Sequence, residues 1–340
     1  MKKFVCLAAS ALMLLVGCEN NTNNSVQASR DVFAMDTYMN LKAYGENAEE
    51  ALLLAEKEIL RLEEMLSVTD ENSDISAINN SNGGSVAVEK DTALIIAKAL
   101  EIGDETGGAL DISVYPVLRE WGFTTGEYKI PEKTKIDVLL ENVDYRRIEL
   151  SDGYVTVPEG YQLDLGSLAK GYTSDRVMAV LAENGVESAV ISLGGNVQTL
   201  GKKTDGTQWK IAVTDPFFPD TALGVLEVSD KAVITSGNYE RYFMGDDGVR
   251  YHHIIDPEDG FPADNGLVSV TVIAESGITC DALSTALFVS GYEKAAELWR
   301  SCGDFDMILI DDSGKICITP GIKESFSLNS DSYDVQVIEK

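Results

Sequence analysis

Hydrophobic residues recur at the spacing of an amphipathic helix in four segments of the chain. Apolar side chains three and four positions apart lie among polar ones in residues 47–66, and the pattern returns in residues 91–106 and 166–184. Glycine directly follows the second and third segments, as is common where a helix ends. Residues 281–302 are also predicted to be helical, with a possible break into two helices at Gly291.

Shorter apolar or alternating runs predict β-strands between these helices. The predicted strands cover residues 186–193, 209–213, 224–228 and 267–273, and a hairpin is expected from residues 307–310 and 315–319. Helices and strands are mixed without the regular alternation of a doubly wound sheet, which predicts the α+β class. No repeat and no Pro- or Ser-rich linker divides the chain after residue 30. We therefore expect one large domain of two merged lobes over residues 31–340, with mixed sheets and flanking helices.

The N-terminal residues predict the cellular location of the protein. Two lysines precede an apolar run over residues 4–16, which is too short to span a bilayer as a mature helix and is typical of a secretory signal over residues 1–17. Small residues before Cys18 are similar to a bacterial lipobox, in which that cysteine is lipidated; the alternative is an ordinary cleaved signal with a stray cysteine. Residues 18–30 would then be the lipidated cysteine and a flexible polar tether. The expected location is the extracytoplasmic side of the cell membrane, on its periplasmic or extracellular face.

Charge and cysteine content narrow the possible partners. The chain has 27 basic and 56 acidic residues, a net charge of −29, which argues against nucleic acid or anionic lipid as a direct partner. A phosphate-bearing ligand would need compensation by a metal or by a few well-placed lysines and arginines. Beyond Cys18 there are three cysteines, an odd number without metal-type spacing, so no disulfide framework is predicted.

The only two histidines of the chain are adjacent, at positions 252 and 253. Almost all the capacity for proton exchange near neutral pH therefore lies in one segment. Asp256 follows three residues after His253, and Pro257 and Gly260 then bend the chain. This combination is typical of an active-site rim, although a surface loop that happens to hold a histidine pair would look the same.

A second segment, Asp164 to Gly171, enters the helix predicted at residues 166–184 through small residues. The first amide groups of a helix favour anions, and Lys170 adds a positive charge one turn into the helix. In so acidic a chain this combination suits a diphosphate. A plain helix start, with Asp164 near the cap, is the alternative.

A third segment places two oxygen ligands on one helical face. Asp281 and Thr285 are four residues apart, so both side chains project in the same direction. A carboxylate, a hydroxyl and nearby backbone carbonyls are hard donors that suit Mg²⁺ and leave positions for phosphate and water. Alternatively, Asp281 only stabilises the helix N-terminus and Thr285 belongs to the core.

Taken together, these segments resemble the ApbE family of Mg²⁺-dependent FAD:protein FMN transferases, and the likeness runs from about Met35 to Leu309. The order of several separate motifs makes it specific. The motifs cover residues 108–111, 164–171, 192–196, 235–239, 253–257 and 281–287. The resemblance implies a single ApbE-like domain, often attached to the membrane as a lipoprotein.

The resemblance also implies roles for individual residues. The FAD site would be lined by Met35, Ala109, Leu110, Asp111, Asp164, Lys170 and Ile255, several of them through backbone atoms. Mg²⁺ would be held by Asp281, Thr285 and the backbone oxygen of Ser167, and His253 matches the reactive-site histidine. Where many members have Ser-x-Tyr with a ring on the flavin, this chain reads Ser67-Val68-Thr69, which makes Thr69 the residue expected at the flavin.

The implied reaction moves FMN from FAD to a threonine hydroxyl and releases AMP. The implied partner is the FMN-accepting domain of an extracytoplasmic flavoprotein, such as a subunit of a membrane redox complex. Two alternatives are a pyrophosphatase that splits FAD into FMN and AMP with water, and a lipoprotein that binds flavin without catalysis. The second alternative leaves His253 and the Asp281–Thr285 pair without a role.

Overall fold

The computed structural model describes residues 26–330 and 333–340. The predicted signal segment and Cys18 therefore lie outside the described residues. Within those two ranges, no helix combines the length and apolar character needed to cross a bilayer. Strand β1 (Gln27–Ala34) starts before the predicted end of the tether. Residues 27–30 therefore belong to the folded domain, and the predicted domain boundary at residue 31 is wrong.

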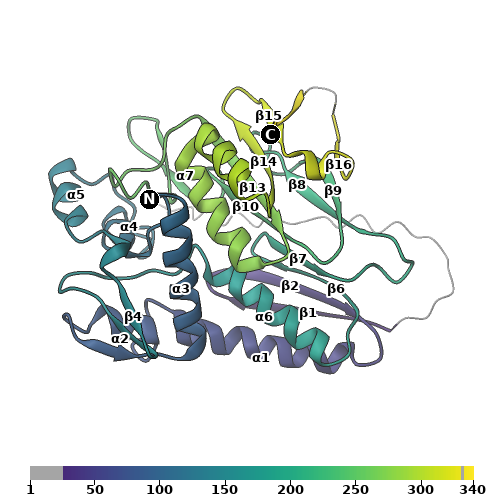
Figure 1. Ribbon diagram of the computed structural model, residues 1–340, viewed down its shortest axis with the longest axis horizontal. Coiled ribbons are helices and arrows are strands. Elements are labelled where there is room, and N and C mark those ends of the chain that lie inside the picture. The colour runs from purple at the N-terminus through teal and green to yellow at the C-terminus, as the bar shows by residue number, and fades with distance from the viewer. Residues whose placement is uncertain (1–25, 331–332) are drawn as a thin grey trace, which may run out of the picture.

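A nine-stranded sheet forms the centre of the molecule, in the order β1-β2-β6-β7-β10-β13-β14-β15-β17 (Figure 1). After β1, its strands are β2 (Thr37–Tyr44), β6 (Ser188–Leu193), β7 (Asn196–Leu200), β10 (Ala232–Gly237), β13 (Leu267–Ala274), β14 (Asp306–Asp311), β15 (Ile316–Ile318) and β17 (Val335–Val337). All neighbours pair antiparallel except β15 and β17. The predicted strands at 186–193 and 267–273 and the predicted hairpin are confirmed.

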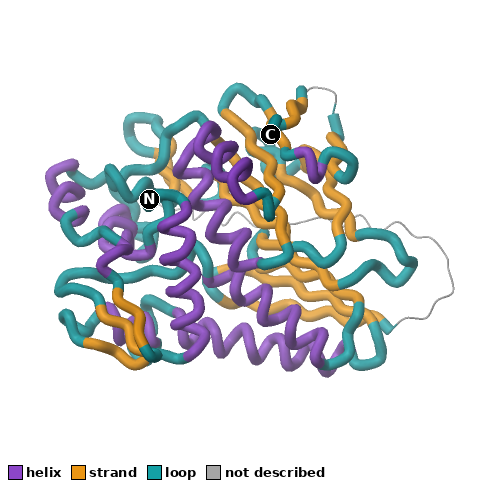
Figure 2. The backbone as a smooth tube through the Cα atoms, in the orientation of Figure 1, coloured by secondary structure: helices purple, strands orange, loops and turns teal. Residues whose placement is uncertain are grey.

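The four long helices are α1 (Ala48–Leu66), α3 (Lys90–Glu105), α6 (Ala169–Glu183) and α7 (Gly277–Cys302). In Figure 2, where helices are purple and strands orange, α6 and α7 lie in front of the sheet and α1 runs below them. All four predicted helices are thus present, although α6 begins three residues later than its pattern suggested. Helix α7 is interrupted at Gly291 (φ 79°, ψ 171°), which confirms the predicted break.

Smaller elements complete the domain and confirm the α+β class. Two three-stranded sheets flank the centre, β16-β9-β8 and β3-β5-β4, and β11 pairs with β12 alone. Their strands are β8 (Trp209–Thr214), β9 (Ala222–Val228), β16 (Phe326–Leu328), β3 (Ser85–Ala87), β5 (Tyr154–Thr156), β4 (Glu149–Ser151), β11 (Tyr242–Met244) and β12 (Arg250–His252). The short helices are α2 (Asp74–Asn79), α4 (Tyr115–Trp121) and α5 (Lys133–Leu140), with 3₁₀ turns η1 (Ile112–Val114), η2 (Tyr145–Arg147) and η3 (Pro320–Ile322). The largest of four hydrophobic clusters draws residues from Leu62 in α1 to Ile338 and so joins both ends of the single domain.

Helices α6 and α7 approach closely because each has a glycine at the contact. A Cβ atom on Gly171 would lie 2.3 Å from the carbonyl oxygen of Gly277 and 2.5 Å from the Cβ of Asp281. The backbone N–H of Gly171 donates to Oδ2 of Asp281 at 2.8 Å. Asp175 of α6 accepts from the backbone N–H groups of Gly277 (2.6 Å) and Ile278 (3.0 Å) and thereby caps α7. This contact places the carboxylate of Asp281 beside the first turn of α6.

We expect Gly171→Ala to lower stability and to disturb Asp281. The added methyl group has no space between the two helix backbones, and overpacking of this kind costs typically about 1–3 kcal/mol. Thermal unfolding monitored by circular dichroism would measure the loss. An unchanged melting temperature would show that the helices can separate at little cost, contrary to the close packing described above.

Candidate active site

The predicted site residues gather around one lysine at the start of α6. The ammonium group of Lys170 influences the ionisation of four side chains from four parts of the chain: Asp164, Glu240, His253 and Asp281. Asp164 precedes α6, Glu240 follows β10, His253 follows β12, and Asp281 lies in α7. We call these five residues the Lys170 cluster. Three segments singled out by the sequence therefore meet in one place.

His253 is held as a neutral base. Its backbone N–H and its ring Nδ1 both lie 3.1 Å from the carbonyl oxygen of Arg241. A carbonyl only accepts, so Nδ1 carries the proton and Nε2 keeps its lone pair. Burial, reinforced by the charge of Arg241, lowers the pKa of His253 to about 3. The imidazole is consequently unprotonated at neutral pH and able to accept a proton at Nε2.

His252 has a structural environment. Its Nε2 lies 3.2 Å from the carbonyl oxygen of Ala263, its Nδ1 accepts from the backbone N–H of Ile254, and its ring meets the edge of Phe288. Both ring nitrogens therefore have partners, and the residue is only 6% exposed. Burial lowers the pKa of His252 to about 4. Of the two histidines, only His253 has a nitrogen free for chemistry.

Asp256 organises the turn that follows His253 and does not orient the imidazole. Its Oδ1 accepts from the backbone N–H of Glu258 at 2.9 Å, and its carbonyl accepts from Gly260 at 2.8 Å. The sequence left both roles open for this carboxylate. The carbonyl of Arg241 takes the orienting role instead.

These environments predict that neither histidine titrates near pH 6.5. Because the folded state disfavours protonation of both rings, their contribution to stability is complete above about pH 6.5 and is lost as the pH falls toward 4 and then 3. Two imidazole C–H resonances in a proton NMR titration would report this directly, since the chain has two histidines. We expect both to keep neutral shifts from pH 8 to 5. A midpoint near 6.5 for either ring would contradict the environment described for it.

The loop before α6 retains the features expected of an anion site. Oδ1 of Asp164 accepts from the backbone N–H of Gly166 at 2.7 Å, and burial raises the pKa of this carboxyl. Leu168, the N-cap residue of α6, makes no side-chain cap hydrogen bond. The N–H groups of Ala169 and Gly171 already have partners in the fold, so an anion at this helix start would be held mainly by the ammonium group of Lys170 in the same turn.

Asp281 and Thr285 could hold a hard cation. Asp281 is 5% exposed, burial raises its pKa, and within the described residues no lysine or arginine forms an ion pair with it. Thr285 Oγ1 lies 3.3 Å from the hydroxyl of Ser236. The charge of Lys170 offsets part of the cost of burying this carboxylate, and a cation bound beside it would compensate it further.

The donor set differs from that of a transition-metal site. In the part of the chain that the structure describes, no group of three or more His, Cys, Asp or Glu side chains is placed to hold a metal. The predicted ligands, the Asp281 carboxylate, the Thr285 hydroxyl and the backbone oxygen of Ser167, would together offer only oxygen donors. Such a set fits Mg²⁺, which keeps several of its waters and shares phosphate oxygens.

The other residues expected at the FAD site lie in different parts of the fold. Met35 lies in the two-residue turn between β1 and β2, where its backbone N–H donates to Glu63 and Thr173 of α6 donates to its sulfur. The side chains of Leu110 and Ile255 are buried in hydrophobic clusters, which leaves their backbone atoms for any ligand. Ala109 packs partly buried against the core, beside Leu110.

Two of the expected FAD residues make local contacts. The carboxylate of Asp111 accepts hydrogen bonds from the N–H and hydroxyl of Ser113 and from the backbone N–H of Tyr145. Thr69 is exposed and its hydroxyl and N–H contact Ser67. These contacts connect neither side chain to the Lys170 cluster.

Glu240 and Arg241 are site residues that sequence reasoning missed. Glu240 lines a cavity of about 60 Å³ with Gly195, Thr235 and Tyr239, where the surrounding protein raises the pKa of its carboxyl to about 7. Arg241 presents its carbonyl to His253. Both directly follow the motif at residues 235–239. The pairing of β11 with β12, which sets Tyr242 opposite His252, brings the carbonyl of Arg241 to His253.

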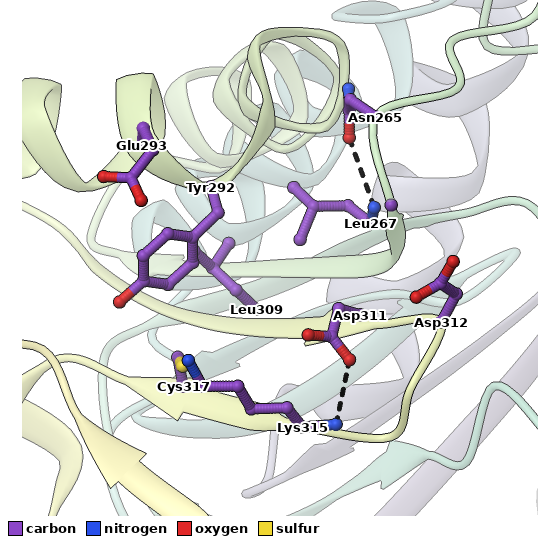
Figure 3. A pocket seen from close by; sticks show the side chains of 10 residues that line it. Asn265, Leu267, Tyr292, Glu293, Leu309, Asp311, Asp312, Lys315 and Cys317 are labelled. Atoms are coloured by element: carbon purple, nitrogen blue, oxygen red, sulfur yellow. Dashed lines mark hydrogen bonds between the residues drawn. The ribbon is translucent and has the colours of Figure 1, made fainter.

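Cavity size does not locate the site. The larger cavity, about 270 Å³, lies between the second half of α7 and strands β14 and β15 (Figure 3). None of the candidate residues lines it. Its polar groups are partly engaged, since Asp311 accepts from the N–H of Lys315 and the ammonium of Lys315 lies 5.4 Å from the centre of the Tyr292 ring.

The fold and the Lys170 cluster define a class of protein. It is a single α+β domain in which two close-packed helices supply a lysine and a buried carboxylate, and the charge of the lysine reaches a neutral histidine. The chain belongs to the ApbE family, whose sequence pattern matches residues 35–309. This confirms the resemblance and its expected extent.

Relatives cover most of the chain. The FAD:protein FMN transferase of Treponema pallidum (strain Nichols) is 31% identical over 316 residues, which span 86% of this chain and 87% of the relative. That of Klebsiella pneumoniae (strain 342) is 34% identical over 282 residues, 82% of this chain and 87% of its own length. Among solved structures, the ApbE protein of Thermotoga maritima superposes with a TM-score of 0.82 at 32% identity, covering 88% of this chain and 99% of that one. The flavin transferase ApbE of Vibrio cholerae gives 0.81 at 26% identity with the same coverage.

Proposed function

We propose that this protein is an FAD:protein FMN transferase that attaches FMN from FAD to a threonine hydroxyl of an extracytoplasmic flavoprotein and releases AMP. The observation that carries the proposal is the Lys170 cluster, in which the charge of one lysine at the start of a helix acts on both a neutral histidine and a buried carboxylate. Relatives that share most of the chain are named FAD:protein FMN transferase.

Different residues of the chain have separate roles in this phosphoryl transfer. Lys170, at the start of α6, binds the diphosphate of FAD and neutralises part of its charge. Nε2 of His253 takes the proton of the threonine hydroxyl while the hydroxyl oxygen bonds to the phosphorus of the FMN part. The phosphorus–oxygen bond to AMP then breaks, AMP leaves with the electron pair, and the proton passes from His253 to solvent.

Asp281, Thr285 and the backbone oxygen of Ser167 would hold Mg²⁺ in this proposal. The ion supplies charge neutralisation at the phosphate oxygens when bound. Asp281 is positioned for this role by the Gly171 amide, which fixes one of its oxygens, and the side chain of Asn196 also stabilises its charged form.

Cys18 would anchor the enzyme to the membrane by lipid, with the domain on the extracytoplasmic side. The proposal rests on the N-terminal sequence. Mass spectrometry of the mature N-terminus of the wild type and of Cys18→Ser would test it. An unmodified Cys18 in the wild type would contradict the proposed lipid anchor.

The transferase proposal is tested by mass spectrometry of a folded flavin-binding acceptor domain co-expressed with this protein. We expect the acceptor to gain the mass of FMN on a threonine and AMP to form in equal amount. Release of free FMN and AMP without modification of the acceptor would favour the pyrophosphatase. FAD that binds and stays intact with Mg²⁺ present would indicate a flavin-binding lipoprotein.

A further inference from the structure

The motif at residues 192–196 ends in a buried amide that has no role in the reaction steps described above. Asn196 is the first residue of β7 and is 4% exposed. In the part of the chain that the structure describes, its Nδ2 is buried and has no partner at hydrogen-bond geometry. A buried donor without a partner costs stability, so a fold that keeps one calls for a functional explanation.

The next amide on the same face of β7 has its partners. Side chains two residues apart on a strand point to the same face, so Gln198 and Asn196 point the same way. Nε2 of Gln198 donates to Asp175 at 2.9 Å, and its Oε1 accepts from the hydroxyl of Ser174. Both partners belong to α6. This face of β7 is therefore turned toward the helices, and Gln198 has a structural role there.

Helix α7 and the sheet keep in step along this face. At one end, a Cβ atom on Gly277 would lie 2.8 Å from Oε1 of Gln198. At the other end, the hydroxyl of Thr285 lies 3.3 Å from that of Ser236 in β10. Four residues advance a helix by about 6 Å and two residues advance a strand by about 6.7 Å. One helical turn thus matches two strand residues.

The level between these two contacts brings Asn196 to Asp281. Asp281 is four residues from both Gly277 and Thr285, and the pairing of β7 with β10 puts Asn196 midway between the levels of Gln198 and Ser236. Burial raises the pKa of Asp281, and the side chain of Asn196 opposes this shift by favouring the charged carboxylate. The amide and the carboxylate are therefore neighbours, although no hydrogen bond of good geometry joins them.

We propose that Asn196 is a positioning residue for the cation site, an inference that rests on the proposed function. Its Nδ2 donates to the carboxylate of Asp281 when Mg²⁺ is bound, since an ionised carboxylate only accepts. Together with the N–H of Gly171, it fixes the direction in which the carboxylate faces the ion. The loss of a hydrogen bond that orients a metal ligand typically costs about tenfold to a hundredfold in metal affinity.

The test measures Mg²⁺ binding without FAD for the wild type, Asn196→Leu and Asn196→Ala. Melting temperatures at increasing Mg²⁺ concentration give the dissociation constant of each protein. We expect this constant to rise by about tenfold to a hundredfold in both variants. Without Mg²⁺, Asn196→Leu should melt at or above the wild-type temperature, because leucine is of similar size and leaves no unpaired donor. The alanine variant keeps the test valid if the leucine side chain does not fit.

Gln198→Leu is the matched control on the same face of β7. It removes an amide whose partners are satisfied, so it should lower the melting temperature and leave the dissociation constant for Mg²⁺ as in the wild type. The same result for the Asn196 variants would make Asn196 a structural residue and overturn the inference.

The remaining outcomes separate this inference from the proposed function. Weaker FAD binding by the Asn196 variants, with an unchanged dissociation constant for Mg²⁺, would assign the amide to the substrate and overturn the positioning role alone. A wild type whose melting temperature does not respond to Mg²⁺ would remove the cation site and this inference with it. Failure of the wild type to modify an acceptor would contradict the proposed function, which is measured separately by mass spectrometry.

Discussion

Replacement of His253 by alanine is expected to abolish most flavin transfer while FAD still binds. The imidazole is held neutral with Nε2 unprotonated, and general-base assistance contributes typically about two to four powers of ten. We therefore expect kcat to fall by about a hundredfold to ten-thousandfold. Quenching of flavin fluorescence should give an FAD dissociation constant close to that of the wild type, because the diphosphate is bound by Lys170 and not by His253 in the proposed mechanism.

A chemical control distinguishes a lost base from a disturbed site. Removal of the ring leaves space beside Phe123, whose ring centre lies 6.4 Å from that of His253, and added imidazole should restore part of the transfer rate in His253→Ala. His252→Gln provides the contrast, since His252 supports buried hydrogen bonds. It should lower the melting temperature, and imidazole should not rescue it. Transfer by His253→Ala at the wild-type rate would remove this residue from the mechanism.

Local patterns along the chain predicted the four long helices well, for a physical reason. Each helix buries one stripe of side chains, so its periodicity survives in the sequence, as in α1 with Leu52, Ile59 and Leu62 inside. The first two strands escaped prediction, although β2 alternates buried Met39 and Leu41 with more exposed neighbours. Strands β11 and β12 have three residues each, too few for an alternation to be recognised.

The site was predicted in its parts but not in its connections. Single segments identified His253, Lys170 and Asp281 because their residue types suit the chemistry. The contact between Gly171 and Asp281 spans 110 positions, and nothing local predicts it. The same applies to Arg241, whose carbonyl and not the nearby Asp256 orients the imidazole. The sequence suggested the Asp256 carboxylate as a partner of the imidazole, whereas the pairing of β11 with β12 places the backbone carbonyl of Arg241 there.

Replacement of Asp281 should remove the dependence on Mg²⁺ together with activity. The buried carboxylate has a Gly171 amide on one oxygen, and in the described residues no basic side chain forms an ion pair with it. Loss of a metal ligand removes several kcal/mol of charge stabilisation, and about 3 kcal/mol corresponds to about a hundredfold in rate. We expect Asp281→Ala and Asp281→Asn to lower kcat by at least that factor.

The asparagine variant separates metal binding from structural support. The asparagine side chain is nearly the same size as the aspartate that it replaces, and its amide oxygen can still accept from the N–H of Gly171. Asp281→Asn should therefore melt without Mg²⁺ at a temperature equal to or above that of the wild type, because an unpaired buried charge has been removed. Mg²⁺ at about a hundred times its dissociation constant should stabilise the wild type by about 2.7 kcal/mol and leave the variant unchanged. Equal stabilisation of both proteins by Mg²⁺ would place the ion elsewhere and would return Asp281 to a purely structural role at the contact of α6 and α7.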